Sequence, residues 1–234
     1  EDTALSARQL AERRARREPL AYIIGHTWFM DLPFHVGPGV LVPRPDSEVL
    51  VEAALNVSET ISSVELDLLD VCTGTGCIGI SLASRLMTKN RLGSLCLTEI
   101  TPEAAHYDHP LDGRATLVMA DLFPPGAYGS WHLIVANPPY IATAAIDPLM
   151  PEVSQYEPRK ALDGGIDGLV FYRRLIAEAA PRLKEGGCLL LEHGFDQAEQ
   201  VAALLANDGR YDLLPMIRDY GGQPRVSGGR LRSR

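Results

Sequence analysis

The chain has 234 residues, of which 46% are hydrophobic and 22% are charged, a composition typical of a folded globular protein and not of a disordered or fibrous one. This length suits one sizeable α/β domain with a small appendage, since single domains commonly run to about 100–200 residues. The formal net charge of -8 disfavours a polynucleotide substrate, because proteins that bind duplexes usually present a basic surface.

The first predicted element is a helix over residues 3–18, which ends before a proline because the preceding residue avoids the helical region. Its arginines alternate with glutamates, which indicates a solvent-exposed helix face, with a nucleic-acid arm as the alternative. Residues 22–45 mix short apolar runs with Gly and Pro and predict a small hairpin or an extended linker. A helix over residues 46–56 follows, with Asp46 or Ser47 as its N-cap.

From residue 64 onward, short apolar strands alternate with helices, which predicts a mostly parallel sheet covered on both faces. The tail differs, because residues 211–218 and 225–231 read as two strands with no helix between them. Such an antiparallel edge separates this pattern from plain dinucleotide-binding folds. The other predicted strands cover residues 64–72, 94–99, 115–120, 132–136 and 187–192, and the predicted helices cover residues 78–86, 168–183 and 197–206.

A glycine-rich turn joins the first of these strands to its helix. Gly74, Gly76 and Gly79 fit the spacing G-x-G-x-x-G, in which glycines let the backbone pass close to a ligand. Glu99 ends the next strand, where a carboxylate can accept both hydroxyls of a ribose. A tight structural turn without a ligand is the alternative, since a glycine fingerprint alone is a weak signal.

Two carboxylates favour S-adenosylmethionine over NAD at this turn. Asp70 lies just before the turn, where an acidic group suits a cationic methionyl moiety better than a pyrophosphate. Asp121 follows the third strand and can accept a hydrogen bond from the adenine amino group while Leu122 packs on the ring. A cap of a helix or turn is the alternative role of Asp121, and an NAD-dependent oxidoreductase is the alternative function.

The fourth strand runs directly into Asn137-Pro138-Pro139-Tyr140, at the crevice beyond the carboxyl ends of parallel strands. The nitrogen of an amide or an exocyclic amino group is a poor nucleophile, because its lone pair is delocalised. The Asn137 side-chain oxygen and the Pro138 carbonyl can each accept one N–H of such a group. The two prolines stiffen the loop, and the Tyr140 ring can stack on a planar substrate. A simple turn is the alternative.

The four cysteines stand singly in apolar runs, without the paired spacing of a zinc site, so we expect buried thiols in a reducing compartment and no metal. No apolar run approaches the roughly 20 residues of a membrane span, and the N-terminus lacks the apolar region of a signal peptide. These features predict a cytoplasmic protein without a membrane partner.

The motifs resemble a known family, the protein-(glutamine-N5) methyltransferases of peptide chain release factors, also called the HemK/PrmC group. The resemblance covers nearly the whole chain, and the block Pro43-Arg44-Pro45 is far more specific than the glycine turn. Besides residues 137–140, the matching stretches are residues 18–25, 34–36, 40–48, 73–76, 156–158, 161–165, 168–169 and 191–194.

The resemblance implies a Rossmann-like class I methyltransferase with a mostly parallel seven-stranded sheet, an antiparallel C-terminal hairpin and the remnant of a small helical N-terminal domain. It divides the chain into residues 1–20, the end of the substrate-recognition domain, residues 21–45, a hairpin or linker, and residues 46–234, the methyltransferase domain. The expected substrate is the glutamine of a Gly-Gly-Gln loop in a release factor, and we expect a monomer that binds no nucleic acid directly.

The site residues follow from the motifs above together with this resemblance. Arg44 is assigned to substrate binding and, together with Glu48, to organising the site, and an ion pair in the linker is the alternative. The predicted catalytic residues are Asn137, Pro138 and Tyr140, and the predicted substrate site adds Pro139 and Arg44. The predicted cofactor site comprises Asp70, Thr73, Gly74, Thr75, Gly76, Glu99, Asp121, Leu122 and Asn137.

Three departures from the family pattern stand out: Glu99 replaces the usual Asp, the helix after it is nearly absent, and the N-terminal helical domain is short. The tail also carries Gly221-Gly222-Gln223, which we interpret as a coincidence and not as the mark of a release factor. An adenine-N6 methyltransferase of DNA or RNA remains the nearest alternative, because a base amino group needs the same acceptors and stacking residue. A binding module without enzymatic activity is a third class.

Overall fold

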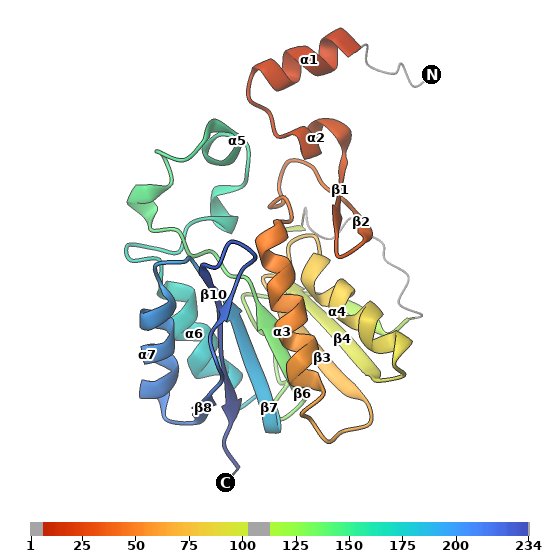
Figure 1. Cartoon of the computed structure of the whole chain (residues 1–234), viewed down its shortest axis with the longest axis vertical. Coiled ribbons are helices and arrows are strands. Elements are labelled where there is room, and N and C mark those ends of the chain that lie inside the picture. The colour runs from red at the N-terminus through yellow and green to blue at the C-terminus, as the bar shows by residue number, and fades with distance from the viewer. Residues whose placement is uncertain (1–6, 103–112, 234) are drawn as a thin grey trace.

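The computed structural model describes residues 7–102 and 113–233 of the chain (Figure 1). The near absence of a helix after Glu99 concerns mainly residues 103–112, and the first predicted helix begins on residues 3–6, so both of these predictions fall outside the described residues. The longer helices are α1 (Ala7–Ala15), α3 (Glu48–Ser58), α4 (Cys77–Thr88), α6 (Val170–Ala179) and α7 (Ala198–Asp208), and the shorter ones are α2 (Leu20–Ile24) and α5 (Pro151–Ser154). The strands are β1 (His26–Phe29), β2 (Leu32–His35), β3 (Leu66–Val71), β4 (Leu92–Glu99), β5 (Ala115–Met119), β6 (Trp131–Ala136), β7 (Leu183–Glu192), β8 (Tyr211–Leu213), β9 (Ile217–Arg218) and β10 (Pro224–Leu231).

The large sheet has the strand order β5-β4-β3-β6-β7-β10-β8, and β9 also pairs with β10. Strands β5, β4, β3, β6 and β7 are parallel to their neighbours, whereas β10 runs antiparallel to β7. The predicted α/β class, with a mostly parallel sheet and an antiparallel C-terminal edge, is confirmed. Over residues 7–102 and 113–233 the large sheet has eight strands where seven were predicted, because the chain between residues 211 and 218 forms two short strands, β8 and β9, and not one.

Each face of the sheet carries its own core. On one face α3 and α4 pack on the sheet, and in Figure 1 they lie in front of the strands. On the other face α6 and α7 pack on alternate residues of the same strands. Strand β3 shows why the sequence reads as a continuous apolar run: Leu66 and Leu68 belong to the first core, whereas Leu69 and Val71 belong to the second.

The N-terminal segment stacks on the end of this sheet at which the parallel strands finish (Figure 1). Residues 22–24, predicted as part of a hairpin or linker, instead belong to α2, which Gly25 ends in the left-handed conformation (φ 86°). The hairpin itself is present as β1 and β2. Its Phe29 and Phe34 meet edge to face and are buried in the core of α3 and α4, so the hairpin is anchored to the large sheet domain. The predicted domain boundaries stay predictions.

Several helix boundaries differ from those predicted, and the first helix ends at Ala15 and not at residue 18. The helix expected from residue 46 begins at Glu48, because Pro45–Ser47 forms a short 3-10 turn. The helix expected over residues 168–183 is confined to α6, because Gly168 has a positive φ of 73° and the chain past Ala180 turns into β7. Within the described residues, no helix is long and apolar enough to cross a membrane.

Candidate active site

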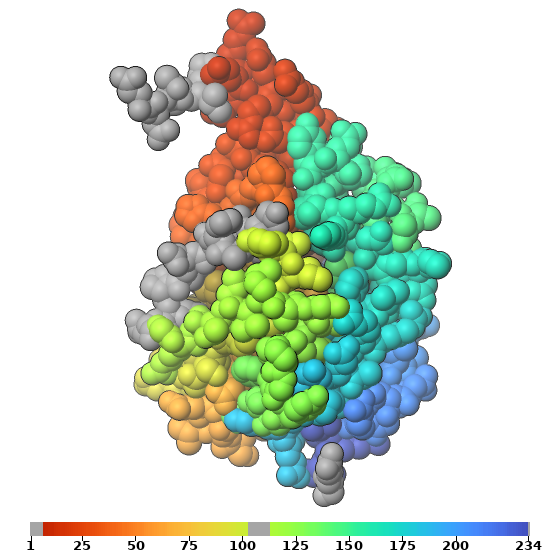
Figure 2. All heavy atoms as spheres, turned by 180° about the vertical axis from the view of Figure 1, so that it is seen from behind, coloured from red at the N-terminus to blue at the C-terminus, as the bar shows by residue number. Residues whose placement is uncertain are grey.

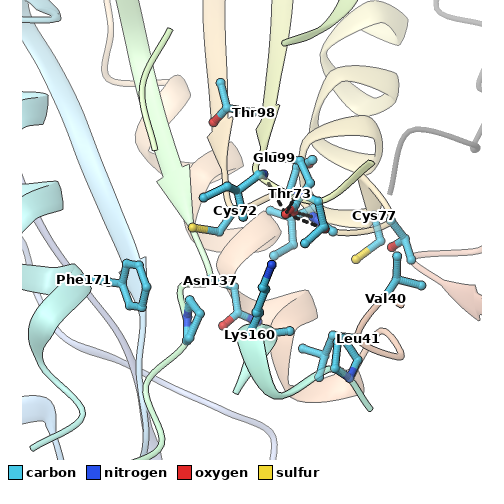
Figure 3. A pocket seen from close by; sticks show the side chains of 18 of the residues that line it. Val40, Leu41, Cys72, Thr73, Cys77, Thr98, Glu99, Asn137, Lys160 and Phe171 are labelled. Atoms are coloured by element: carbon cyan, nitrogen blue, oxygen red, sulfur yellow. Dashed lines mark hydrogen bonds between the residues drawn. The ribbon is translucent and has the colours of Figure 1, made fainter. Parts of the chain in front are cut away.

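A cavity of about 400 Å³ lies at the carboxyl ends of β3, β4, β5 and β6. The turn between β3 and α4 forms one wall, and the loops of residues 39–44 and 158–163 form the opposite side (Figure 3). This volume falls in the range of small-molecule sites, and the place is the crevice at which parallel α/β sheets bind ligands.

The turn between β3 and α4 brings backbone to the cavity in an unusual conformation. Gly74 and Gly76 have φ values of 55° and 79°, which favour glycine, and Cys72 has a φ of 59° that a residue with a Cβ rarely adopts. Thr73, Gly74 and Thr75 line the cavity, whereas Gly76 lies behind them as the N-cap of α4. The Thr75 hydroxyl is buried beside the cavity without a hydrogen-bond partner among the described residues, and it lies close enough to the Cys77 thiol to lower the pKa of that thiol.

Asp70 lies behind the turn and does not line the cavity. Its Oδ2 accepts hydrogen bonds from the Thr73 hydroxyl (2.6 Å) and the Gly79 amide (2.9 Å). Complete burial raises the pKa of Asp70 to about 7, and the charge of Glu99 acts in the same direction. Asp70 therefore holds the turn in shape, and direct contact with a methionyl group is not supported by its position.

Glu99 lines the cavity at the end of β4. Its Oε1 accepts from the Ile100 amide and from both the amide and the hydroxyl of Thr101, at 2.9–3.1 Å. Within the described part of the chain, its Oε2 accepts from the Gly74 amide alone, at 3.0 Å, and so retains a lone pair. This oxygen is the better acceptor for a ribose hydroxyl.

The segment after β5 supplies Asp121 and Leu122 to the cavity. Arg174 of α6 forms a bidentate ion pair with Asp121 (3.0 and 3.2 Å), so this carboxylate faces both the cavity and the helix. Leu122 is buried and has a positive φ of 69°, and its carbonyl accepts from the Thr98 hydroxyl at 2.6 Å. Strained backbone of this kind tends to occur at ligand sites.

Asn137 and Pro139 of the Asn-Pro-Pro-Tyr segment line the cavity, whereas Pro138 and Tyr140 do not. The Asn137 side-chain nitrogen Nδ2 donates to the Ser47 hydroxyl at 3.2 Å. Burial raises the pKa of Tyr140 to about 12, and its carbonyl accepts from Gln197 Nε2 at 2.9 Å. The stacking role predicted for Tyr140 stays a prediction.

Arg44 also lines the cavity, but its guanidinium is already paired. Arg44 Nη2 donates to both carboxylate oxygens of Glu157 (2.7 and 2.6 Å), and the Glu157 side chain is almost completely buried. Glu48 does not line the cavity and instead accepts from the Met30 amide at 2.9 Å. The pair of Arg44 and Glu157 joins two stretches of the family resemblance and fixes one wall of the cavity.

Some residues of the site were not predicted from the sequence. Lys160 and Phe171 line the cavity, and Figure 3 shows Lys160 reaching into it from the side opposite the turn. No local motif marks either residue. Ser47 was predicted only as a helix cap, but makes no capping hydrogen bond and instead accepts from Asn137.

Most charges around the cavity are paired. Three carboxylates line it, those of Glu99, Asp121 and Asp163, together with the two cations Arg44 and Lys160. Arg44 pairs with Glu157, Asp121 with Arg174 and Asp163 with Arg159. Among the described residues, Glu99 and Lys160 are therefore the lining charges without an ion-pair partner.

The Gly-Gly-Gln sequence of the tail forms the turn between β9 and β10. The Asp219 amide donates to the Gln223 carbonyl (2.8 Å), and the Gln223 amide donates to Asp219 Oδ1 (2.9 Å). The motif is thus a hairpin turn, in agreement with its interpretation as a coincidence. Among the described residues, no group of three or more His, Cys, Asp or Glu side chains could hold a metal ion.

The chain is similar in sequence to known proteins and similar in fold to solved structures. No family model matches the chain. The release factor glutamine methyltransferase of Geobacter sulfurreducens is 43% identical over 230 residues, which cover 97% of this chain and 78% of that protein. The protein of the same name from Thermodesulfovibrio yellowstonii is 36% identical over 227 residues, covering 96% and 81%. Among solved structures, a methyltransferase from Pyrococcus furiosus shares the fold, with a TM-score of 0.56, 18% identity, and coverage of 96% of this chain and 100% of that one.

Proposed function

The chain belongs to the release factor glutamine methyltransferases, and from this membership we propose that it methylates the side-chain amide nitrogen of the glutamine in the Gly-Gly-Gln motif of peptide chain release factors. The methyl donor is S-adenosylmethionine. Methyl transfer as such is common to the family. The release factor as substrate and the residues assigned below form the specific proposal.

The cavity residues fit this donor. Glu99 Oε2 has a lone pair for a ribose hydroxyl, and the Thr75 hydroxyl is buried without a partner. Asp121 can accept from the adenine amino group beside the apolar Leu122, and the Glu99 carboxylate, which has no ion-pair partner among the described residues, adds a negative charge that suits a sulfonium. When bound, S-adenosylmethionine supplies an electrophilic methyl group on its positively charged sulfur.

The Asn-Pro-Pro-Tyr segment orients the substrate amide. Asn137 Oδ1 accepts one N–H of the glutamine NH2 group, and the carbonyl of Pro138, which lies between the lining residues Asn137 and Pro139, accepts the other, so the nitrogen lone pair is left free for the methyl group. Asn137 and Pro138 would hold the nitrogen for a displacement in which a C–N bond forms as the C–S bond of the donor breaks, and solvent would take the proton that the nitrogen loses. Alignment supplies most of the rate enhancement, so no strong base is needed before transfer.

One observation carries this proposal: Asn137 lines the cavity at the end of β6, and its Nδ2 is already engaged by Ser47. A side-chain amide has two donors on nitrogen and an acceptor oxygen. With the nitrogen directed to Ser47, the oxygen is the atom left to receive a substrate N–H.

The test is transfer of tritiated methyl from S-adenosylmethionine to a release factor, to a ribosomal protein and to duplex DNA. We expect label on the release factor, and we expect Asn137→Ala to lower kcat by about 100-fold while S-adenosylmethionine still binds in calorimetry. Asn207→Ala, which alters an exposed amide of α7, is the matched control and should keep the wild-type rate.

Preferential labelling of DNA would overturn the proposal in favour of the adenine-N6 alternative. Equal rates for Asn137→Ala and the control would remove Asn137 from the reaction. Tight binding of NAD without binding of S-adenosylmethionine would instead support the oxidoreductase.

A further inference from the structure

Glu192 is a buried carboxylate next to the catalytic segment. It ends β7, the parallel neighbour of β6, and the pair Ala136 and Leu191 fixes the register of the two strands. The next residues, Asn137 and Glu192, therefore leave neighbouring strand ends in step. Glu192 is 1% exposed, and its Oε2 has no hydrogen-bond partner among the described residues. A buried, partly unsatisfied carboxylate is costly to the fold, so its presence calls for a reason.

Ser47 connects Glu192 with Asn137. Ser47 is 2% exposed at the start of α3, which packs on β6 and β7. Its hydroxyl accepts from Asn137 Nδ2 at 3.2 Å. Ser47 and Asn137 lie close enough to Glu192 to lower the pKa of its carboxyl, so all three side chains meet behind the cavity.

The chemistry of these groups fixes the direction of each hydrogen bond. An ionised carboxylate can only accept, so the single proton of Ser47 is drawn to Glu192. The Ser47 oxygen is then an acceptor toward Asn137 and selects its NH2 end. A reversed amide would place the Asn137 oxygen against the carboxylate, where two acceptors repel.

We propose that Glu192 is a positioning residue, which acts through Ser47 to hold the Asn137 amide with Oδ1 facing the substrate nitrogen. This inference rests on the proposed function, in which that oxygen accepts a hydrogen bond from the substrate amide. Glu192 itself touches neither substrate nor cofactor, because it does not line the cavity.

The charges around Glu192 make the orientation of Asn137 sensitive to pH. Burial raises the pKa of Glu192 to about 7, the charge of Asp46 acts in the same direction, and Ser47, Arg225 and Asn137 oppose it. The other titratable groups that act on Glu192 are Tyr140, Tyr172 and Cys77, all neutral near pH 7 because burial raises the pKa of each. Once protonated, Glu192 can donate, and the direction of the hydrogen bonds is no longer fixed.

Glu192→Gln tests the proposal, because it keeps the shape of the side chain and removes the charge. We expect kcat for release factor methylation to fall by about 10- to 100-fold, since small misplacements of an aligned group cost rates of this order. The affinity for S-adenosylmethionine should not change. Wild-type kcat should rise with pH through about 7, and this step should vanish in Glu192→Gln and persist in Glu192→Asp.

Asp67→Asn is the matched control. Asp67 is a partly buried carboxylate at the opposite end of the sheet, paired with Lys184 at 2.7 Å, and its variant should keep both the rate and the pH profile. An unchanged rate and pH profile in Glu192→Gln, with an active wild type, would overturn the positioning role and leave the proposed function intact.

A second readout does not depend on transfer. The side-chain NH2 resonances of Asn137, observed by NMR in the wild-type protein, should titrate with a midpoint near pH 7 and lose this titration in Glu192→Gln. If the wild type transfers no methyl to release factors, the proposed function fails while this titration still decides the role of Glu192. Asn137 resonances that do not respond to pH would overturn the positioning role of Glu192.

Discussion

Asp70 is an acidic residue whose surroundings disfavour its charge. It is fully buried, its Oδ1 has no hydrogen-bond partner among the described residues, and its pKa is raised to about 7. In the unfolded chain an aspartate titrates near pH 4. The folded state thus binds more protons than the unfolded state between about pH 4 and pH 7, so the free energy of unfolding falls as pH rises through this window.

Asp70→Asn should remove this part of the pH dependence. We expect the wild type to lose about 1–3 kcal/mol more than the variant between pH 5 and pH 8, as measured by urea unfolding. Asp212→Asn, which changes an exposed aspartate, is the control and should behave as the wild type. Parallel stability curves for the wild type and Asp70→Asn would show that Asp70 keeps its ordinary pKa.

The sequence predicted residues whose chemistry lies in a local motif. Glu99, Asp121 and Asn137 line the cavity as expected, because each directly ends or follows a strand of a parallel sheet. The roles of Glu157 and Glu192 could not be predicted, because their partners are distant in the sequence. Arg44, the partner of Glu157, lies 113 residues away from it. Ser47, which acts on Glu192, belongs to another element of the fold. The sequence contains no signal for contacts of this kind.

At the scale of elements, the loop before α6 supports the catalytic segment. Gly168 has a φ of 73°, and a Cβ built on it would lie 2.4 Å from the Tyr140 carbonyl oxygen and 2.6 Å from Gln197 Nε2. Gln197 Nε2 donates to both the Tyr140 and the Gly168 carbonyls. A side chain at position 168 would therefore push the two loops apart.

Gly168→Ala should reduce stability by about 1–3 kcal/mol and also lower the rate of methyl transfer, because Tyr140 must move. Gly186→Ala is a matched control, since Gly186 has nearly the same φ of 72° and no atom within 4 Å of its Cβ position. It should lose stability from backbone strain alone and keep its rate. Equal loss of activity in both variants, measured by initial rates, would contradict a specific role of the loop.

Element types were predicted better than element ends. The alternation of strands and helices follows from hydrophobic periodicity, which is a local property. The break between β8 and β9, the 3-10 turn at Pro45–Ser47 and the helix α2 depend on packing and on single backbone angles, which periodicity does not contain.

At the scale of the whole molecule, the N-terminal segment contacts a loop remote in sequence. Arg14 and Arg17 pair with Glu152 of α5 (2.9 and 2.6 Å), and the Tyr156 hydroxyl donates to the Arg16 carbonyl at 2.7 Å. Figure 2 shows these two parts of the chain against each other at one end of the molecule. The arginines of this segment are thus partly engaged within the protein, which weakens the alternative of a nucleic-acid arm.

The net charge of -8 is also a property of the whole molecule. It lowers the affinity for nucleic acid and leaves a protein as the favoured substrate. The monomeric state and the cytoplasmic location stay predictions.

The most direct test of the proposed function is the position of the added methyl group. A release factor incubated with the wild-type protein and S-adenosylmethionine should gain ~14 Da, the mass of one methylene. Peptide mapping should place the gain on the glutamine of its Gly-Gly-Gln motif. A methyl group on another residue, or no gain in mass while DNA is methylated, would contradict the account.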